Sequence, residues 1–481
     1  MNVNLANPEF PEASALNASD VTLGQFEFDE LTEENQYTED EDFNTRLDFE
    51  LPVTLGNRAG FLKVGGRARL KTKFRDNNFF EFSPIDEDAI ATLDDVPTKD
   101  YTKDNFLPGD FYDAGLFADE TYLGGLDLDN ASAFEAEAVP DEFLPVNYQA
   151  EENIYGGYLM WSQALSDKLS MLAGVRVEAT DISYIGNSIQ FLEDEILIEP
   201  AIGTDNYVNV LPGLHFKYNF TDNSMLRAAW TNTLARPNYY DLVPYRNLVE
   251  GDEEIFQGNP DLDPTTSMNF DLMFEQYFSS VGVLSAGAFY KSVNDFIYVS
   301  QTEDSNTGYD FFQPRNGGDA DVTGFEIAFQ RQLDFLPGIW KGLGVYVNYT
   351  FLSSNATGVA NEDGDVREDL DLPGTAPHML NASLSYENKR LVLRASLNFA
   401  DAYIDEVGGN AFYDRYYDSQ LFVDVNGSYA FTPEFRFFFE MNNLTNQPLR
   451  YYQGVASRTM QTEYYNARFN AGVKYDLFKR K

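Results

Sequence analysis

The chain has 481 residues and a formal net charge of −45, from 33 basic and 78 acidic side chains, a balance that excludes nucleic-acid binding through a basic surface. It contains no cysteine, which excludes disulfides and thiol catalysis, and its two histidines, His215 and His378, leave little scope for histidine catalysis or zinc binding. Hydrophobic residues make up 43% of the chain without a run of 18 apolar residues, so no membrane-spanning helix is expected. We predict no enzymatic activity, no metal site and no cofactor.

The N-terminal segment Met1–Asn7 has neither the basic nor the apolar region of a secretory signal. An exported protein with this N-terminus would have lost its signal, or would be the C-terminal piece of a longer protein. Both readings stay open at this point.

Phe61–Phe74 is the clearest predicted strand, because apolar and charged residues alternate strictly along it. Its odd positions form a basic stripe that comprises Lys63, Arg67, Arg69, Lys71 and Lys73. In a barrel this stripe would face the lumen. It would act there as an anion-attracting wall, or as solvated charge paired with acidic residues of neighbouring strands, and we favour the pairing.

The segment 83–147 follows this strand and is strongly acidic, with 17 Asp or Glu residues against Lys99 and Lys103. Such a composition predicts a long solvated loop that attracts cations, although adaptation to salt would leave the same signature. Beyond it, Arg176 and Glu178 alternate with apolar residues, so they share the inner, lumen-facing side of one strand. An ion pair with a neighbouring strand, or with a domain that plugs the barrel, is favoured there over contact with a ligand.

Period-two alternation returns at 214–220, 391–399, 421–431 and 435–442. Short and long connections alternate between the strands. The short ones fall near 56–60, 166–168, 221–223, 279–282, 334–342, 387–389 and 432–434, and the long ones near 83–147, 184–206, 234–264, 300–316, 355–373, 403–419 and 446–461. This is the pattern of a transmembrane antiparallel β-barrel with short periplasmic turns and long extracellular loops. We predict an all-β fold with about 16 strands and a periplasmic C-terminus.

Several short motifs give the chain a family resemblance. Leu234-Ala235-Arg236-Pro237 is followed by Gly258-Asn259-Pro260 and later by Phe289-Tyr290-Lys291, Thr323-Gly324-Phe325-Glu326, Asn348-Tyr349-Thr350, Asn443-Leu444-Thr445-Asn446 and Arg450-Tyr451-Tyr452. In this order and spacing they resemble the C-terminal half of TonB-dependent outer-membrane receptors. Within that family the motifs most resemble the large receptors for oligosaccharide uptake, and siderophore receptors share the same barrel.

The resemblance implies a barrel in the bacterial outer membrane that imports a large nutrient with energy delivered by TonB to a plug domain. Its partners would be membrane lipid, TonB through the plug, and the nutrient. Because such barrels have about 22 strands, residues 1–481 would be the C-terminal part of one, without plug or signal peptide, and the sheet would be open or incomplete. A self-contained passive porin is the alternative.

Arg236 and Pro237 stand where a strand meets a loop, and Asn259 and Pro260 where a loop returns to a strand, so we predict structural roles for all four. Aromatic loop residues are the candidates for ligand binding, because aromatic faces stack on sugar rings and on apolar ligands. These candidates are Tyr239, Tyr240, Tyr245, Tyr403, Tyr413, Tyr416 and Tyr417. Packing within the loops is the alternative role for them.

Overall fold

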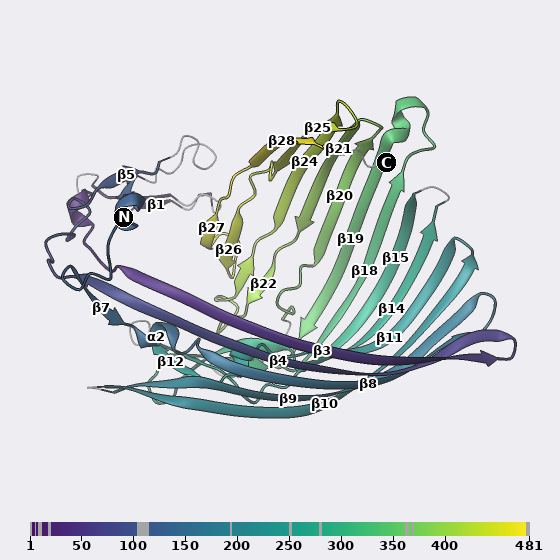
Figure 1. The fold of residues 1–481 in the computed structure, drawn as a ribbon, viewed down its shortest axis with the longest axis horizontal. Coiled ribbons are helices and arrows are strands. Elements are labelled where there is room, and N and C mark those ends of the chain that lie inside the picture. Colours follow the sequence, from purple (N-terminus) through teal and green to yellow (C-terminus); the bar gives the residue numbers. More distant parts are fainter. Residues whose placement is uncertain are drawn as a thin grey trace.

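The computed structural model describes the whole chain except residues 1, 5, 8–11, 18–20, 103–114, 193–194, 250–252, 279–280, 361–364, 368–369 and 478–481. Long antiparallel strands form a single curved wall, and Figure 1 shows the sheet bending around a central space. The expected all-β class is confirmed. In the described part of the chain, no helix has both the length and the apolar character needed to cross a membrane.

The wall strands are paired in the order of the sequence. They are β3 (Thr32–Leu55), β4 (Arg58–Pro84), β8 (Tyr148–Ala164), β9 (Leu169–Leu192), β10 (Glu195–Thr221), β11 (Ser224–Ala235), β14 (Thr265–Tyr277), β15 (Gly282–Asn294), β18 (Asp319–Gln332), β19 (Leu343–Ala356), β20 (His378–Glu387), β21 (Leu391–Ala400), β24 (Gln420–Ala430), β25 (Phe435–Asn442) and β28 (Arg468–Tyr475). These described strands number fifteen, against the sixteen expected. The described residues before β3 contribute to the strands the short pair β1 (Asn2–Asn4) and β2 (Glu12–Ser14), which forms a separate sheet.

The two ends of this series are β3 and β28. The strand order places them next to each other in a closed barrel. The residue pairings, however, connect each wall strand to its neighbours in the series. Among the described residues, no residue pairing joins β3 directly to β28. The open or incomplete barrel therefore stays a prediction.

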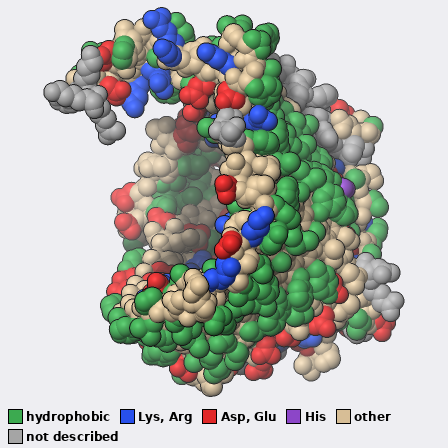
Figure 2. All heavy atoms as spheres, turned by 90° about the vertical axis from the view of Figure 1, so that its right-hand side faces the viewer, with side chains coloured by type: hydrophobic (Ala, Val, Ile, Leu, Met, Phe, Trp, Pro, Cys, Tyr) green, Lys and Arg blue, Asp and Glu red, His purple; other side chains and the backbone are tan. Residues whose placement is uncertain are grey.

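Apolar side chains cover the outside of the wall. On β4 the even positions Leu62, Val64, Leu70 and Phe74 are 37–48% exposed, while the basic stripe lies on the opposite face. Figure 2 shows hydrophobic side chains spread over the outer surface beside a hollow. An apolar exterior around a polar interior is what a membrane barrel requires.

The short connections lie at one end of the wall and the long ones at the other (Figure 1). One of the tightest joins β3 to β4 through Gly56, whose φ of 64° is in the left-handed region that glycine adopts without strain. One expected loop is wrong. Residues 184–192 and 195–206 belong to the paired strands β9 and β10. Tyr184 is only 1% exposed, because Leu242, Val243 and Tyr245 of the connection 236–264 pack against it, a contact that the local sequence does not reveal.

The long connections carry short elements of their own. Residues 85–147 contain β5 (Thr98–Asp100), β6 (Leu116–Ala118), α1 (Glu120–Leu123), β7 (Phe134–Ala138) and α2 (Pro140–Phe143), and the later ones contain α3 (Tyr239–Leu242), β12 (Arg246–Val249), β13 (Glu254–Gln257), β16 (Ile297–Glu303), β17 (Asp310–Asn316), β22 (Tyr403–Glu406), β23 (Arg415–Tyr417), β26 (Leu449–Gln453) and β27 (Thr459–Glu463). Their apolar side chains form two clusters, one against β8 and β9 and one between the connections around β16 and β22. The long connections are therefore packed structures over one end of the wall. Residues 103–114 of the predicted acidic loop lie outside the described part.

Candidate functional site

The basic stripe of β4 faces an acidic stripe on β3. Arg69 donates to Asp42 at 2.6 and 2.8 Å, and Lys71 lies 3.1 Å from Asp40. Arg67 donates through Nε to the Asn44 side chain at 3.0 Å. At the ends of the stripe, the register pairs Lys63 with Glu50 and Lys73 with Asp40. Opposite charges thus alternate across two strands of the inner wall, which leaves less net charge there than the basic stripe alone suggests.

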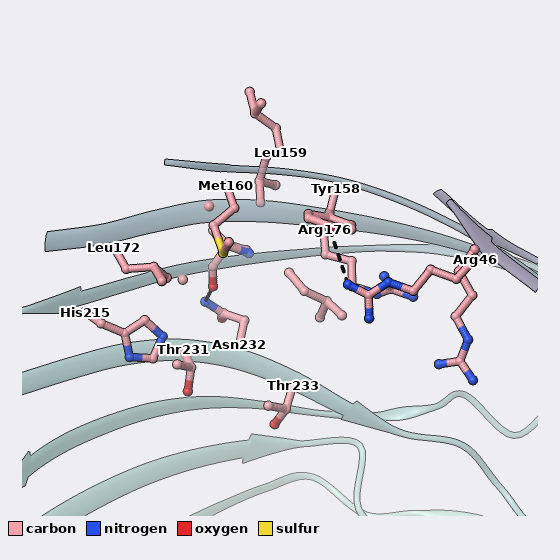
Figure 3. Close-up of a pocket in the computed structure, with 16 residues that line it drawn as sticks. Arg46, Tyr158, Leu159, Met160, Leu172, Arg176, His215, Thr231, Asn232 and Thr233 are labelled. Carbon is pink, nitrogen blue, oxygen red and sulfur yellow. Dashed lines mark hydrogen bonds between the residues drawn. The ribbon is translucent and has the colours of Figure 1, made fainter. Parts of the chain in front are cut away.

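A hollow of about 470 Å³ opens in the inner wall beside this stripe, across strands β3 to β11. Figure 3 shows Arg46 reaching toward Tyr158, to which it donates at 3.3 Å, with Arg176 nearby and His215 farther along the wall. Arg176 lies over Gly156, where a Cβ atom would come within 2.5 Å of a guanidinium nitrogen. This glycine therefore leaves room for the long arginine side chain to lie against the wall.

Arg236 ties the end of β11 to the inner wall. Its guanidinium donates to Glu178 at 2.7 Å and to the Thr180 hydroxyl at 3.1 Å, and it lies 3.8 Å from Glu152. Arg176 forms the second ion pair of Glu178. The guanidiniums of Arg236 and Arg176 thus face the carboxylates of Glu152 and Glu178. Charges that are largely buried need partners of opposite sign in this way. We call Arg236, Glu152, Glu178, Arg176 and Thr180 the Arg236 network.

The connection 236–264 begins at this network and packs inward. The Tyr239 hydroxyl donates to Glu152 at 3.1 Å, and the Tyr240 and Tyr245 rings stack with centroids 4.6 Å apart. Burial raises the pKa of all three phenols, and Glu152 raises that of Tyr239 further. Tyr245 is only 5% exposed. In this conformation these three predicted ligand contacts stabilise the connection against β8 and β9.

The Gly258-Asn259-Pro260 motif holds the other end of the same connection. Asn259 donates from its side chain to the Pro314 carbonyl at 2.9 Å, and the Pro260 carbonyl accepts from the Tyr184 hydroxyl at 3.1 Å. A Cβ atom on Gly258 would lie 1.8 Å from a backbone oxygen, so only glycine fits. Pro237, at the start of the connection, is buried. These contacts are those of structural residues.

The other four predicted tyrosines lie on or beside a small outer sheet of β22, β23, β26 and β27. Tyr403, Tyr417 and Tyr451 form a ladder on one face, with successive ring centroids 5.6 and 4.9 Å apart. On the opposite face Tyr416 stacks on Tyr452 at 5.1 Å. The sequence pointed to Tyr451 and Tyr452 only as motif residues. Their adjacency in a strand was the signal that could have placed them on opposite faces.

Tyr413 lies next to this outer sheet and is the most accessible of the predicted tyrosines. Its side chain is 48% exposed and packs edge-on against Phe412, whose ring carries the Arg458 guanidinium at 3.5 Å from its centroid. The predicted tyrosines therefore divide into a buried group at 239–245 and a group at 403–417 on the outer connections.

A cavity of about 590 Å³ lies between these two groups. Its charged lining residues are Arg236, Asp241, Asp405, Glu406 and Arg415. The Arg415 guanidinium lies 2.7 Å from both Asp405 and Glu406, so neither sign dominates. Among the described residues, no group of three or more His, Asp or Glu side chains is placed to hold a metal ion. The cavity is suited to a polar ligand that both donates and accepts hydrogen bonds.

Comparison with protein families decides what this barrel is. A family model described as the TonB-dependent receptor-like β-barrel matches residues 4–444. The chain belongs to the TonB-dependent receptor β-barrel family. It is accordingly a bacterial outer-membrane protein, and the predicted localisation is confirmed.

Solved structures of other receptors show the same fold. The siderophore receptor PiuA from Acinetobacter baumannii is 13% identical, with a TM-score of 0.56 over 92% of this chain and 56% of its own. The ferric-catecholate import receptor Fiu from E. coli K12 is 10% identical, with a TM-score of 0.58 over 92% and 55%. The copper transporter OprC is 12% identical, with a TM-score of 0.51 over 91% and 62%. The chain thus spans little more than half the length of these receptors, and no curated protein sequence matches it.

Proposed function

We propose that this receptor barrel forms the wall and ligand-capturing mouth of a transporter that imports a large nutrient with energy delivered through TonB. Family membership carries the proposal. The charged inner wall and the packed connections around a 590 Å³ cavity support it, because a transporter needs a polar path and a structured entrance. A passive porin is disfavoured by the family match, and the proposal includes no enzymatic step.

For the nutrient, the chemistry of the mouth favours a neutral, hydroxyl-rich ligand such as an oligosaccharide. The cavity carries two guanidiniums and three carboxylates, and the tyrosine ladder lies on the neighbouring connections. An anionic chelate would meet no excess of positive charge there. A ferric chelate is the second candidate, since PiuA and Fiu are receptors for siderophores and ferric catecholates and share the fold.

The test uses cells that produce the full-length receptor. We expect surface binding of the nutrient to persist, and its accumulation to stop, when the inner-membrane proton gradient is collapsed. Accumulation that continues would support a passive pore instead. Ligand class is tested separately on the purified full-length receptor, by comparing neutral oligosaccharides with ferric chelates. Tight binding of the chelates alone would reject the oligosaccharide proposal and leave energised uptake intact.

A further inference from the structure

A small extracellular unit stands apart from the barrel mouth. It comprises the described residues of 21–31 and 85–133 and lies beyond the ends of β3 and β4 (Figure 1), and we call it the outer lobe. Two backbone hydrogen bonds join its segments, from Phe28 to Ala91 at 2.8 Å and from Leu93 to Phe26 at 3.0 Å. The α1 helix, capped by Asp119, packs beside them. The outer lobe thus has a structure of its own.

The outer lobe encloses a pocket of about 290 Å³ that no part of the uptake proposal uses. Apolar side chains from three separate segments line it, among them Phe26, Phe28, Leu93, Tyr122, Leu123 and Leu126. Two of these side chains remain accessible, Phe26 at 52% and Leu123 at 44%. The pocket therefore offers water an apolar surface that the fold of the lobe leaves uncovered.

Membrane lipid does not account for this surface. The outward-facing apolar positions of β4 extend to Phe74, and about ten residues of the strand follow before it ends at Pro84. These residues rise roughly 3.3 Å each along a strand tilted by about 45°, which places the outer lobe on the order of 20 Å above the bilayer. A concave, mostly apolar pocket with a few polar groups has the form of a small-molecule site.

The charge around the pocket selects the kind of ligand. Glu27, Asp29 and Glu30 contribute to the lining, which has no Lys or Arg among the described residues. The described residues of 83–147, which surround it, carry 14 Asp or Glu side chains against Lys99. The resulting negative potential attracts cations and repels anions. The apolar floor, in turn, favours a ligand with a ring or a short aliphatic body.

We propose that the outer-lobe pocket binds a small amphipathic cation, with one or two rings or a short aliphatic chain carrying an amine. The size fits, because a cavity of about 150 Å³ holds benzene, and this pocket has nearly twice that volume. The apolar body would lie against Phe26, Phe28 and Leu93, with the amine toward the carboxylates. This site is independent of the barrel lumen and of nutrient uptake.

The test measures binding of tryptamine to the whole chain in lipid nanodiscs, with empty nanodiscs as the reference for partition into lipid. Ala118→Trp fills the pocket, whereas Ala136→Trp adds the same side chain at an exposed position of β7 outside it. We expect Ala118→Trp to weaken binding at least tenfold and Ala136→Trp to change it less than twofold. Indole-3-acetate, the anionic counterpart, should bind at least tenfold more weakly than tryptamine.

A second variant keeps the proposal testable if Ala118→Trp disturbs the lobe. The triple variant Glu27→Gln, Asp29→Asn and Glu30→Gln removes three negative charges from the pocket lining. It should weaken tryptamine binding and leave binding of uncharged indole unchanged. Absence of tryptamine binding by the unmodified chain, equal binding of indole-3-acetate, or an equal loss in both tryptophan variants would each overturn the proposal.

Discussion

Replacing Arg236 with methionine should release the start of the connection 236–264 from the barrel wall. The Glu152 and Glu178 side chains are only 6% and 12% exposed, and Arg236 is 22% exposed. Without Arg236, Glu178 would keep its pair with Arg176. Glu152, in contrast, would be left with the Tyr239 hydrogen bond and the attraction of the more distant Arg69. Removing one partner of a buried ion pair costs about 3–5 kcal/mol, and the partial exposure of Arg236 puts the expected loss near the lower value. A loss of about 3 kcal/mol raises the local opening equilibrium roughly a hundredfold.

Hydrogen exchange of the backbone amides in 239–246 measures this opening, because the amides of Val243 and Tyr245 are hydrogen-bonded within the packed connection. Arg227→Met is the matched control. Arg227 lies on β11, the strand that ends just before Arg236, and its pair with Glu275 at 3.1 Å is more exposed, so its loss should cost less than about 1 kcal/mol. Equal exchange rates in the two variants would refute the role assigned to the Arg236 network.

Three further predictions concern the connections at the barrel mouth. Gly258→Ala should loosen the connection 236–264 and speed its proteolysis, since the added Cβ atom would lie 1.8 Å from a backbone oxygen. At Gly157 the added Cβ atom meets open space, so Gly157→Ala should leave proteolysis of that connection unchanged. Asp414→Asn should weaken the buried two-bond pair with Arg367 (2.6 and 2.7 Å) by about 3 kcal/mol and speed cleavage of the connections 357–377 and 401–419; unchanged cleavage would contradict this. Burial raises the pKa of the Asp241 carboxyl. Between its ordinary and its raised pKa, Asp241 is therefore protonated in the folded connection and ionised in the released connection. The stability of the folded connection should therefore rise as the pH falls through this raised pKa, and exchange rates corrected for intrinsic chemistry should lose that pH dependence in Asp241→Asn.

The wall could be predicted from the sequence because its signals are local. Alternation along 61–74 fixed which face of β4 is charged, and that face meets Asp40 and Asp42 of β3. The alternating short and long connections predicted the two ends of the barrel. Arg176 and Glu178 were placed on one face and form an ion pair. Each of these inferences needed only the two-residue period of a strand.

The mouth could not be predicted in the same way, because its contacts join distant segments. Glu152 was missed, since nothing local tells that Arg236 and Tyr239 reach it from more than 80 residues away. The hairpin at 184–206 was taken for a loop, because its polar residues gave no sign of the connections that cover it. Its Tyr184 is 1% exposed only because the connection 236–264 packs there.

Labelling of single cysteines in intact cells tests the central claim of an outer-membrane barrel with its long connections outside. The chain has no cysteine, so Tyr413→Cys and Asn57→Cys each introduce one thiol, at an outer connection and at the β3–β4 turn. A maleimide too large for porins should label Tyr413→Cys in intact cells, and should label Asn57→Cys only after the outer membrane is permeabilised. Labelling of Asn57→Cys in intact cells, or protection of Tyr413→Cys until permeabilisation, would contradict the account.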